Sequence, residues 1–87
     1  MKDTRETISD KELCKNQEKL HTTELGLIRI KRNLSLETDD VVSWCRKLIC
    51  SPSAQRIRQG KNWYISKDQY ILTVNAHSYT IITGHLR

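Results

Sequence analysis

The chain has 87 residues, of which 37% are hydrophobic and 29% are charged, and its formal net charge at pH 7 is +5. This length supports one domain with a single small core and excludes a deep internal cavity for a large cofactor. Residues 55–87 contain five basic residues and one acid, which gives +4, while residues 1–54 contain ten and nine, which gives +1. This concentrated positive charge favours an anionic partner, either nucleic acid or an acidic protein.

The sequence has no apolar run near the ~20 residues that cross a bilayer, and its first residues lack the apolar centre of a secretory signal. We therefore expect a cytoplasmic protein without a membrane partner. Cys14, Cys45 and Cys50 are odd in number and form no C-x-x-C pair, so we expect reduced, buried thiols. The sequence shows no zinc or phosphate-loop motif, and we expect neither a metal nor another cofactor.

The first half of the chain is expected to be helical. Residues 8–20 predict a weakly amphipathic helix with Ser9 or Asp10 as N-cap, and we interpret residues 1–20 as a polar, mobile arm preceding one compact domain over residues 21–87. A second helix is expected to begin at Thr22 or Thr23 and to end near Asn33, because apolar residues recur at helical spacing. Residues 27–30 are also compatible with a strand.

A third helix is predicted after residue 38. Thr38 supplies a hydroxyl cap, and the two aspartates that follow it complement the positive end of the helix dipole. Residues 41–49 provide a broad apolar face, and Pro52 prevents continuation of the helix.

The hydrophobic period then changes from helical to alternating. Gln59 and Gly60 are compatible with a tight turn, residues 66–69 form a second polar turn, and residues 76–78 form a third. The expected fold class is α+β, with two or three N-terminal helices followed by a three- or four-stranded antiparallel meander. The expected strands cover residues 55–58, 62–65, 70–75 and 79–83.

A candidate nucleic-acid-binding group lies near the first strand turn. Lys61 can neutralise a phosphate while the ring of Trp63 or Tyr64 stacks on a base. Alternation along a strand places these two rings on opposite faces, so one of them serves the core. Further cations are candidates for phosphate contacts, although those at the end of the second helix also compensate its dipole. They are Arg29, Lys31, Arg32, Arg56 and Arg58.

A candidate catalytic group lies in the last strand and the loop before it. His77, Tyr79, Thr83 and His85 have the residue types that metal-independent RNA cleavage needs, namely proton-transferring groups and hydroxyl donors. Tyr79, Thr83 and His85 share one face if the strand is regular. The alternative interpretation is that His77 is a turn residue and that His85 lies on a frayed terminus.

Four strings of residues carry a family resemblance: HTTELG at 21–26, RIKRNL at 29–34, GKNWY at 60–64 and SYTIITGH at 78–85. In this order they resemble a family of short bacterial proteins known only as a domain of unknown function, which implies a grouping without an activity. The element order and the late YT-x-x-T-x-H strand resemble, more weakly, the barnase, endoU, colicin and RelE-like small ribonucleases.

The sequence thus favours a small basic protein that binds an acidic partner through its C-terminal sheet. Nucleic acid, with RNA favoured, is the first hypothesis for that partner. A metal-independent ribonuclease or toxin-like effector is the second hypothesis, and a protein-binding inhibitor or adaptor is the third. A homodimer formed through a sheet edge is a further alternative.

Overall fold

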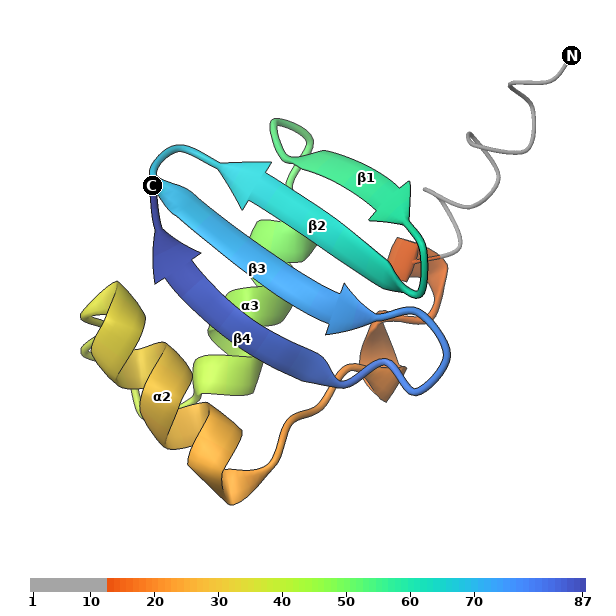
Figure 1. Ribbon diagram of the computed structural model, residues 1–87. Helices are drawn as coiled ribbons and strands as arrows, with labels where there is room; N and C mark the ends of the chain where they lie inside the picture. Colours follow the sequence, from red (N-terminus) through yellow and green to blue (C-terminus); the bar gives the residue numbers. More distant parts are fainter. Residues whose placement is uncertain (1–12) are drawn as a thin grey trace, which may run out of the picture.

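A computed structural model describes residues 13–87 and has the predicted α+β architecture. Its four strands form one antiparallel sheet in the order β1-β2-β3-β4, which is a simple meander. Figure 1 shows α3 behind this sheet and α2 alongside the edge strand β4. The elements are η1 (Gln17–Lys19), α2 (Glu24–Leu34), α3 (Val41–Ile49), β1 (Gln55–Gln59), β2 (Asn62–Lys67), β3 (Tyr70–Asn75) and β4 (Ile81–Leu86).

Side-chain caps define where the two main helices begin. The Thr23 side chain accepts a hydrogen bond from the backbone N–H of Gly26, which confirms the predicted start of α2. For α3 the predicted cap is wrong, because the N-cap is Asp40, whose carboxylate accepts from the N–H of Ser43. Thr38, two residues earlier, accepts a hydrogen bond from the N–H of Asp40. The two side chains therefore share the capping role.

The described part of the N-terminal segment is helical at residues 13–15 and continues into the short 3-10 helix η1. Leu13 and Leu20 are buried in the core, so residues 13–20 pack against the rest of the domain. Arg46 on α3 holds this segment by donating hydrogen bonds to the carbonyls of Glu18 and Leu20. The predicted caps Ser9 and Asp10 lie outside the described residues.

Two strand connections differ from the predicted ones. Gln59 pairs with Asn62, so the first turn consists of Gly60 and Lys61 and does not include Gln59. Gly60 has a φ of 63°, which a glycine adopts without steric cost. The last strand begins at Ile81, two residues later than predicted, and extends to Leu86.

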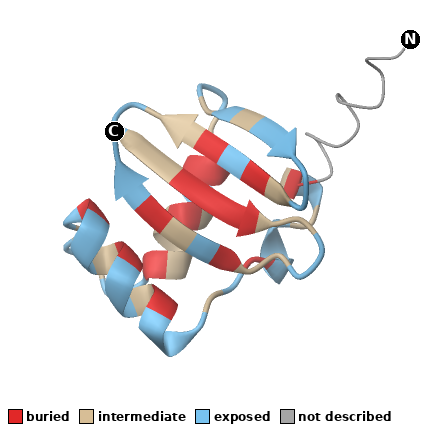
Figure 2. Ribbon diagram, viewed as in Figure 1, coloured by how far each residue is buried: buried red, intermediate tan, exposed pale blue. Residues whose placement is uncertain are grey.

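The sheet has one apolar face and one polar face. The apolar inner face packs against the helices, and the outer face is covered by no helix (Figure 1). Figure 2 shows the resulting alternation of buried and exposed positions along β2. The buried apolar core consists of Leu13, Leu20, Ile30, Leu34, Val41, Cys45, Leu48, Ile49, Trp63, Ile65, Leu72, Val74 and Ile81.

The expectation of three reduced cysteines is wrong for two of them. Cys14 and Cys50 form a disulfide across 36 positions of sequence. Their distance along the chain gave no indication of this pairing, which arises because the N-terminal segment packs beside the end of α3. Cys45 is free and buried, and burial raises the pKa of its thiol to about 12. Cys45 is therefore protonated at neutral pH.

Candidate functional site

The outer face of the sheet is organised around one row of four side chains. Strand register aligns Ile57, Tyr64, Thr73 and Thr83, one from each strand. Three inter-strand spacings make this row about 14 Å long. Tyr64 is 37% exposed and Ile57 is 56% exposed, whereas Thr73 between the neighbouring strands is only 9% exposed. The row offers one accessible aromatic ring on the uncovered face of the sheet.

Polar, mostly uncharged side chains lie on both sides of this row. Towards one end, register aligns Gln59, Asn62 and Asn75. Towards the other end, register aligns Gln55, Ser66, Ile71 and His85. Amide and hydroxyl groups donate and accept hydrogen bonds without imposing a fixed charge.

The four strands contain no aspartate or glutamate. The acids of the described chain all lie in helices, loops or turns, while basic side chains occur in β1 and β2. An anionic ligand on the outer face would therefore meet no carboxylate from a strand. The acids of residues 13–87 are Glu18, Glu24, Glu37, Asp39, Asp40 and Asp68.

The predicted binding residues of β1 and β2 divide between the two faces. Arg56 and Arg58 align with Ile65 and Trp63, so they belong to the inner-face rows. Arg56 donates to the carbonyls of Ile49 and Ser51 at the end of α3, where a cation complements the helix dipole.

Trp63 is a core residue and not an accessible ring. Its side chain is 5% exposed, and the guanidinium of Arg58 lies 6.0 Å from the centroid of its ring. Arg58 also donates from Nε to the carbonyl of Gly60. Of the two predicted rings, Tyr64 alone is available on the outer face, as the alternation rule requires.

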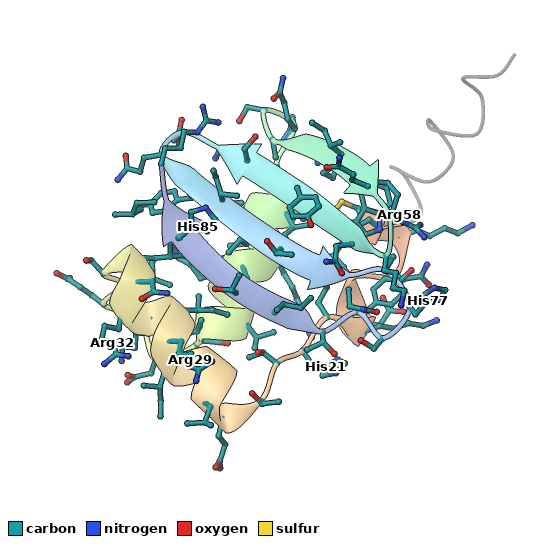
Figure 3. All side chains as sticks on the ribbon, viewed as in Figure 1. His21, Arg29, Arg32, Arg58, His77 and His85 are labelled. Atoms are coloured by element: carbon teal, nitrogen blue, oxygen red, sulfur yellow. A yellow bond between two sulfur atoms is a disulfide. The ribbon has the colours of Figure 1, made fainter. Side chains whose placement is uncertain are left out.

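The remaining predicted cations flank the sheet. Lys61 is exposed in the turn between β1 and β2. Arg29 and Arg32 are exposed on α2, the helix that lies alongside β4 (Figure 3). Lys31 instead forms an ion pair with Asp39 at 2.9 Å, and the hydrogen bond from Lys31 lowers the pKa of the Asp39 carboxyl.

The predicted catalytic residues do not form one cluster. His77 lies in the loop before β4, and His85 lies near the far end of that strand, where it pairs with Ile71 (Figure 3). The four residue steps from Ile81 to His85 alone extend about 13 Å. Because hydrogen-bonded proton transfer operates over about 3 Å, the two imidazoles do not share a site. His77 lies in a turn, as the alternative interpretation had it, whereas His85 pairs with Ile71 within the sheet and does not lie on a frayed terminus.

Tyr79 and Thr83 are separated by an irregularity in the last strand. Tyr79 has a φ of 61°, an uncommon conformation for a bulky residue, and a register shift follows between Thr73 and Val74. The Tyr79 hydroxyl accepts a hydrogen bond from Asn16, so it faces the N-terminal segment. Thr83 remains in the outer-face row.

A polar group that the sequence analysis did not select forms where the chain before α2 meets β4. His21 and Thr80 form an isolated parallel bridge, and His21 Nε2 lies 3.2 Å from Thr80 Oγ1. Thr80 Oγ1 is 2.7 Å from Ser78 Oγ, and His21 Nδ1 is 2.8 Å from the carbonyl of Lys19. That carbonyl only accepts, so Nδ1 carries a proton.

This His21 group fastens the segment before α2 to the sheet. Thr22 Oγ1 adds a hydrogen bond to the carbonyl of Ile81, and backbone bonds join His21 to Tyr79 and Ile81. The two halves of the group are 59 positions apart, so no periodicity or local spacing indicated it. These contacts satisfy the polar atoms of the His21 group, which is what a structural junction requires.

No cluster of three metal-ligating side chains occurs within residues 13–87. Over the same residues, no helix combines the length and apolar character that a membrane crossing requires. On the outer face, Tyr64 can stack on a ring, the amides and hydroxyls can form hydrogen bonds, and the flanking cations attract an anion.

A family model described as "Protein of unknown function (DUF3781)" matches residues 14–85. This match confirms the grouping that the four strings indicated. No curated protein and no solved structure gives a significant match to the chain.

Proposed function

We infer that this chain, which belongs to the DUF3781 family, binds single-stranded nucleic acid across the outer face of its sheet. The observation that carries the proposal is an open four-stranded face with an exposed Tyr64 ring and no carboxylate on any strand. Base stacking on an aromatic side chain contributes about 1–3 kcal/mol per base and tolerates different bases. Tyr64 is the stacking residue of this proposal.

The polar side chains around Tyr64 suit an unpaired strand better than a duplex. Bases in a single strand expose edges that Asn62 and Thr83 can reach by hydrogen bonding, whereas the edges in a duplex lie within grooves. A flat sheet does not enter the deep, narrow major groove of an RNA helix. RNA is the favoured ligand because its 2′-hydroxyl both donates to and accepts from such groups.

Cations at the border of the face supply the electrostatic part of the affinity. Lys61 lies in the β1–β2 turn at one end of the sheet, and Arg29 and Arg32 are exposed on α2, the helix alongside β4. Phosphate contacts from such residues release counterions, so the affinity falls as salt rises. Because His77 and His85 lie at opposite ends of β4, we propose binding without strand cleavage.

The test is fluorescence anisotropy with a labelled, short oligouridine over a series of salt concentrations. Tyr64→Ala is expected to weaken binding by about 1–3 kcal/mol, and Tyr64→Phe, which keeps the ring, is expected to weaken it much less. Lys61→Ala is expected to lower the salt slope by about 0.7, the value for one phosphate contact on a single strand. Lys15→Ala, the same charge change on the N-terminal segment, is the matched control.

Two results would overturn the proposal. One is saturable binding that Tyr64→Ala leaves unchanged, and the other is an absence of oligouridine and oligothymidine binding at low salt. If an acidic protein binds the same face while both oligonucleotides do not, the partner is a protein. Loss of intact RNA in the presence of EDTA would contradict binding without cleavage.

A further inference from the structure

A small cavity lies on the helix side of the molecule, away from the outer face. It has a volume of about 190 Å³ and is lined by Trp44, Lys47, Leu48, Lys67, Asp68 and Tyr70. The positions in α3 are three and four residues apart, so they share one side of that helix. Lys67 and Tyr70 are paired at the end of the β2–β3 hairpin. Helix α3 and the β2–β3 hairpin thus build the cavity.

Two aromatic rings form part of its wall. Trp44 and Tyr70 meet edge to face, with ring centroids 5.0 Å apart and an interplanar angle of 83°. Both side chains are only half-buried, so the pair leaves ring surface open to the cavity. Such surface favours a planar ring, which gains both apolar contact and aromatic geometry.

The charged groups of the cavity favour an anion. Lys47 and Lys67 contribute two positive charges and Asp68 contributes one negative charge. The ion pair within residues 13–87 is Lys31 with Asp39, so neither lysine of the cavity forms an ion pair with a carboxylate. Asp68 partly offsets the attraction of the two lysines for an anion. A bare anion, which gains no contact with the rings, is therefore disfavoured.

We propose that this cavity binds a small aromatic anion, meaning one planar ring system that carries a phosphate or carboxylate group. Sites for drug-sized ligands occupy about 300–1,000 Å³. The smaller volume here fits one ring system and not an extended cofactor. The ring packs against Trp44 and Tyr70, and Lys47 and Lys67 hold the anionic group. This site is independent of nucleic-acid binding on the outer face.

Adenosine 5′-monophosphate, phenyl phosphate, adenosine and inorganic phosphate are the four probes for calorimetric titration of the full chain. The first two are expected to bind saturably, whereas adenosine lacks the anion and inorganic phosphate lacks the ring. Fluorescence of Trp44 is expected to change with the same affinity, and Trp44→Phe is expected to remove that change while retaining binding. Phenyl phosphate separates general ring chemistry from recognition of a nucleotide.

Variants of the two lysines locate the binding. Lys47→Ala and Lys67→Ala are each expected to weaken adenosine 5′-monophosphate binding about tenfold, the loss typical of one hydrogen bond to a charged group. Lys15→Ala makes the same charge change outside the cavity and is expected to leave the affinity unchanged. Equal affinity in all three variants, or no saturable binding of either aromatic phosphate, would overturn the proposal. Circular dichroism confirms that each variant is folded.

Discussion

The two faces of the sheet are built from the same four strands but have different roles. On the inner face, Ile65 and Leu72 are fully buried beneath the helices. On the outer face, Ile57 and Tyr64 remain exposed among amides and hydroxyls. Burial of apolar area on the inner face supplies the stability of the domain. The outer face contributes less to stability, so its exposed ring and apolar side chain are available to a partner.

The largest expected effect tests this difference with a matched pair of isoleucines. Ile65→Ala removes a fully buried side chain, and we expect a loss of about 2–5 kcal/mol in the free energy of unfolding. Ile57→Ala removes a side chain that is 56% exposed, and we expect a loss below about 1 kcal/mol. Urea denaturation measures both values. Similar losses would show that the two faces do not differ in their contribution to stability.

The second effect concerns the disulfide, which joins the N-terminal segment to the end of α3. Removing it with Cys14→Ser or Cys50→Ser is expected to cost about 3–4 kcal/mol, because a cross-link over 36 positions restricts the unfolded chain. Reductant added to the wild-type protein is expected to give a comparable loss and to have no effect on either variant. A denaturation midpoint that reductant leaves unchanged in the wild type would contradict a stabilising role for this bond.

The third effect tests how tightly Leu72 of β3 and Leu34 of α2 pack against the inner side of β4. A Cβ added at Gly84 would lie 2.7 Å from Leu72 Cδ2 and 3.3 Å from Leu34 Cδ1. Gly84→Ala is therefore expected to cost about 1–3 kcal/mol through overpacking. Thr83→Ser, on the outer side of the same strand, is expected to change stability by about 0.5 kcal/mol at most. Thermal unfolding compares them, and a neutral Gly84→Ala would indicate looser packing of Leu72 and Leu34 around this position.

The smallest effect lies outside both faces, at the exposed pair of Lys31 and Asp39. The hydrogen bond and charge of Lys31 lower the pKa of Asp39 below its ordinary value of 3.8. The resulting stabilisation is present above pH 3.8 and is lost as the pH falls through the lowered value. We expect Asp39→Asn to be slightly less stable than the wild type at pH 7 and equal to it at low pH. A larger difference at low pH would contradict this sign.

Sequence patterns predicted the architecture because the strongest signals were local. The apolar spacing of α2, the aspartate-rich start of α3 and the alternation in β2 and β3 each follow from residues that are close in sequence. Residues 70–75 were predicted as a strand and form β3. Even the capping error at Thr38 was small, because Asp40 supplies the same chemistry two residues later.

The features that the sequence patterns did not predict depend on contacts between segments that are distant in the sequence. Tyr79 departs from the regular strand because it has a positive φ and because the register shifts beside Val74. The alternation of apolar and polar residues shows neither feature. The pairing of Cys14 with Cys50, and of His21 with Thr80, requires the folded arrangement of the N-terminal segment. The charge count correctly located cations in the C-terminal third but did not reveal that Arg56 caps α3.

The most direct test of nucleic-acid binding by the outer face is a map of backbone amide chemical shifts during titration with short oligouridine. The largest changes are expected in the row of Ile57, Tyr64, Thr73 and Thr83, with smaller changes at the turn that contains Lys61. The amides of α3 are expected to shift little. Changes concentrated on α3, or no saturable changes in the outer-face row at low salt, would contradict the account.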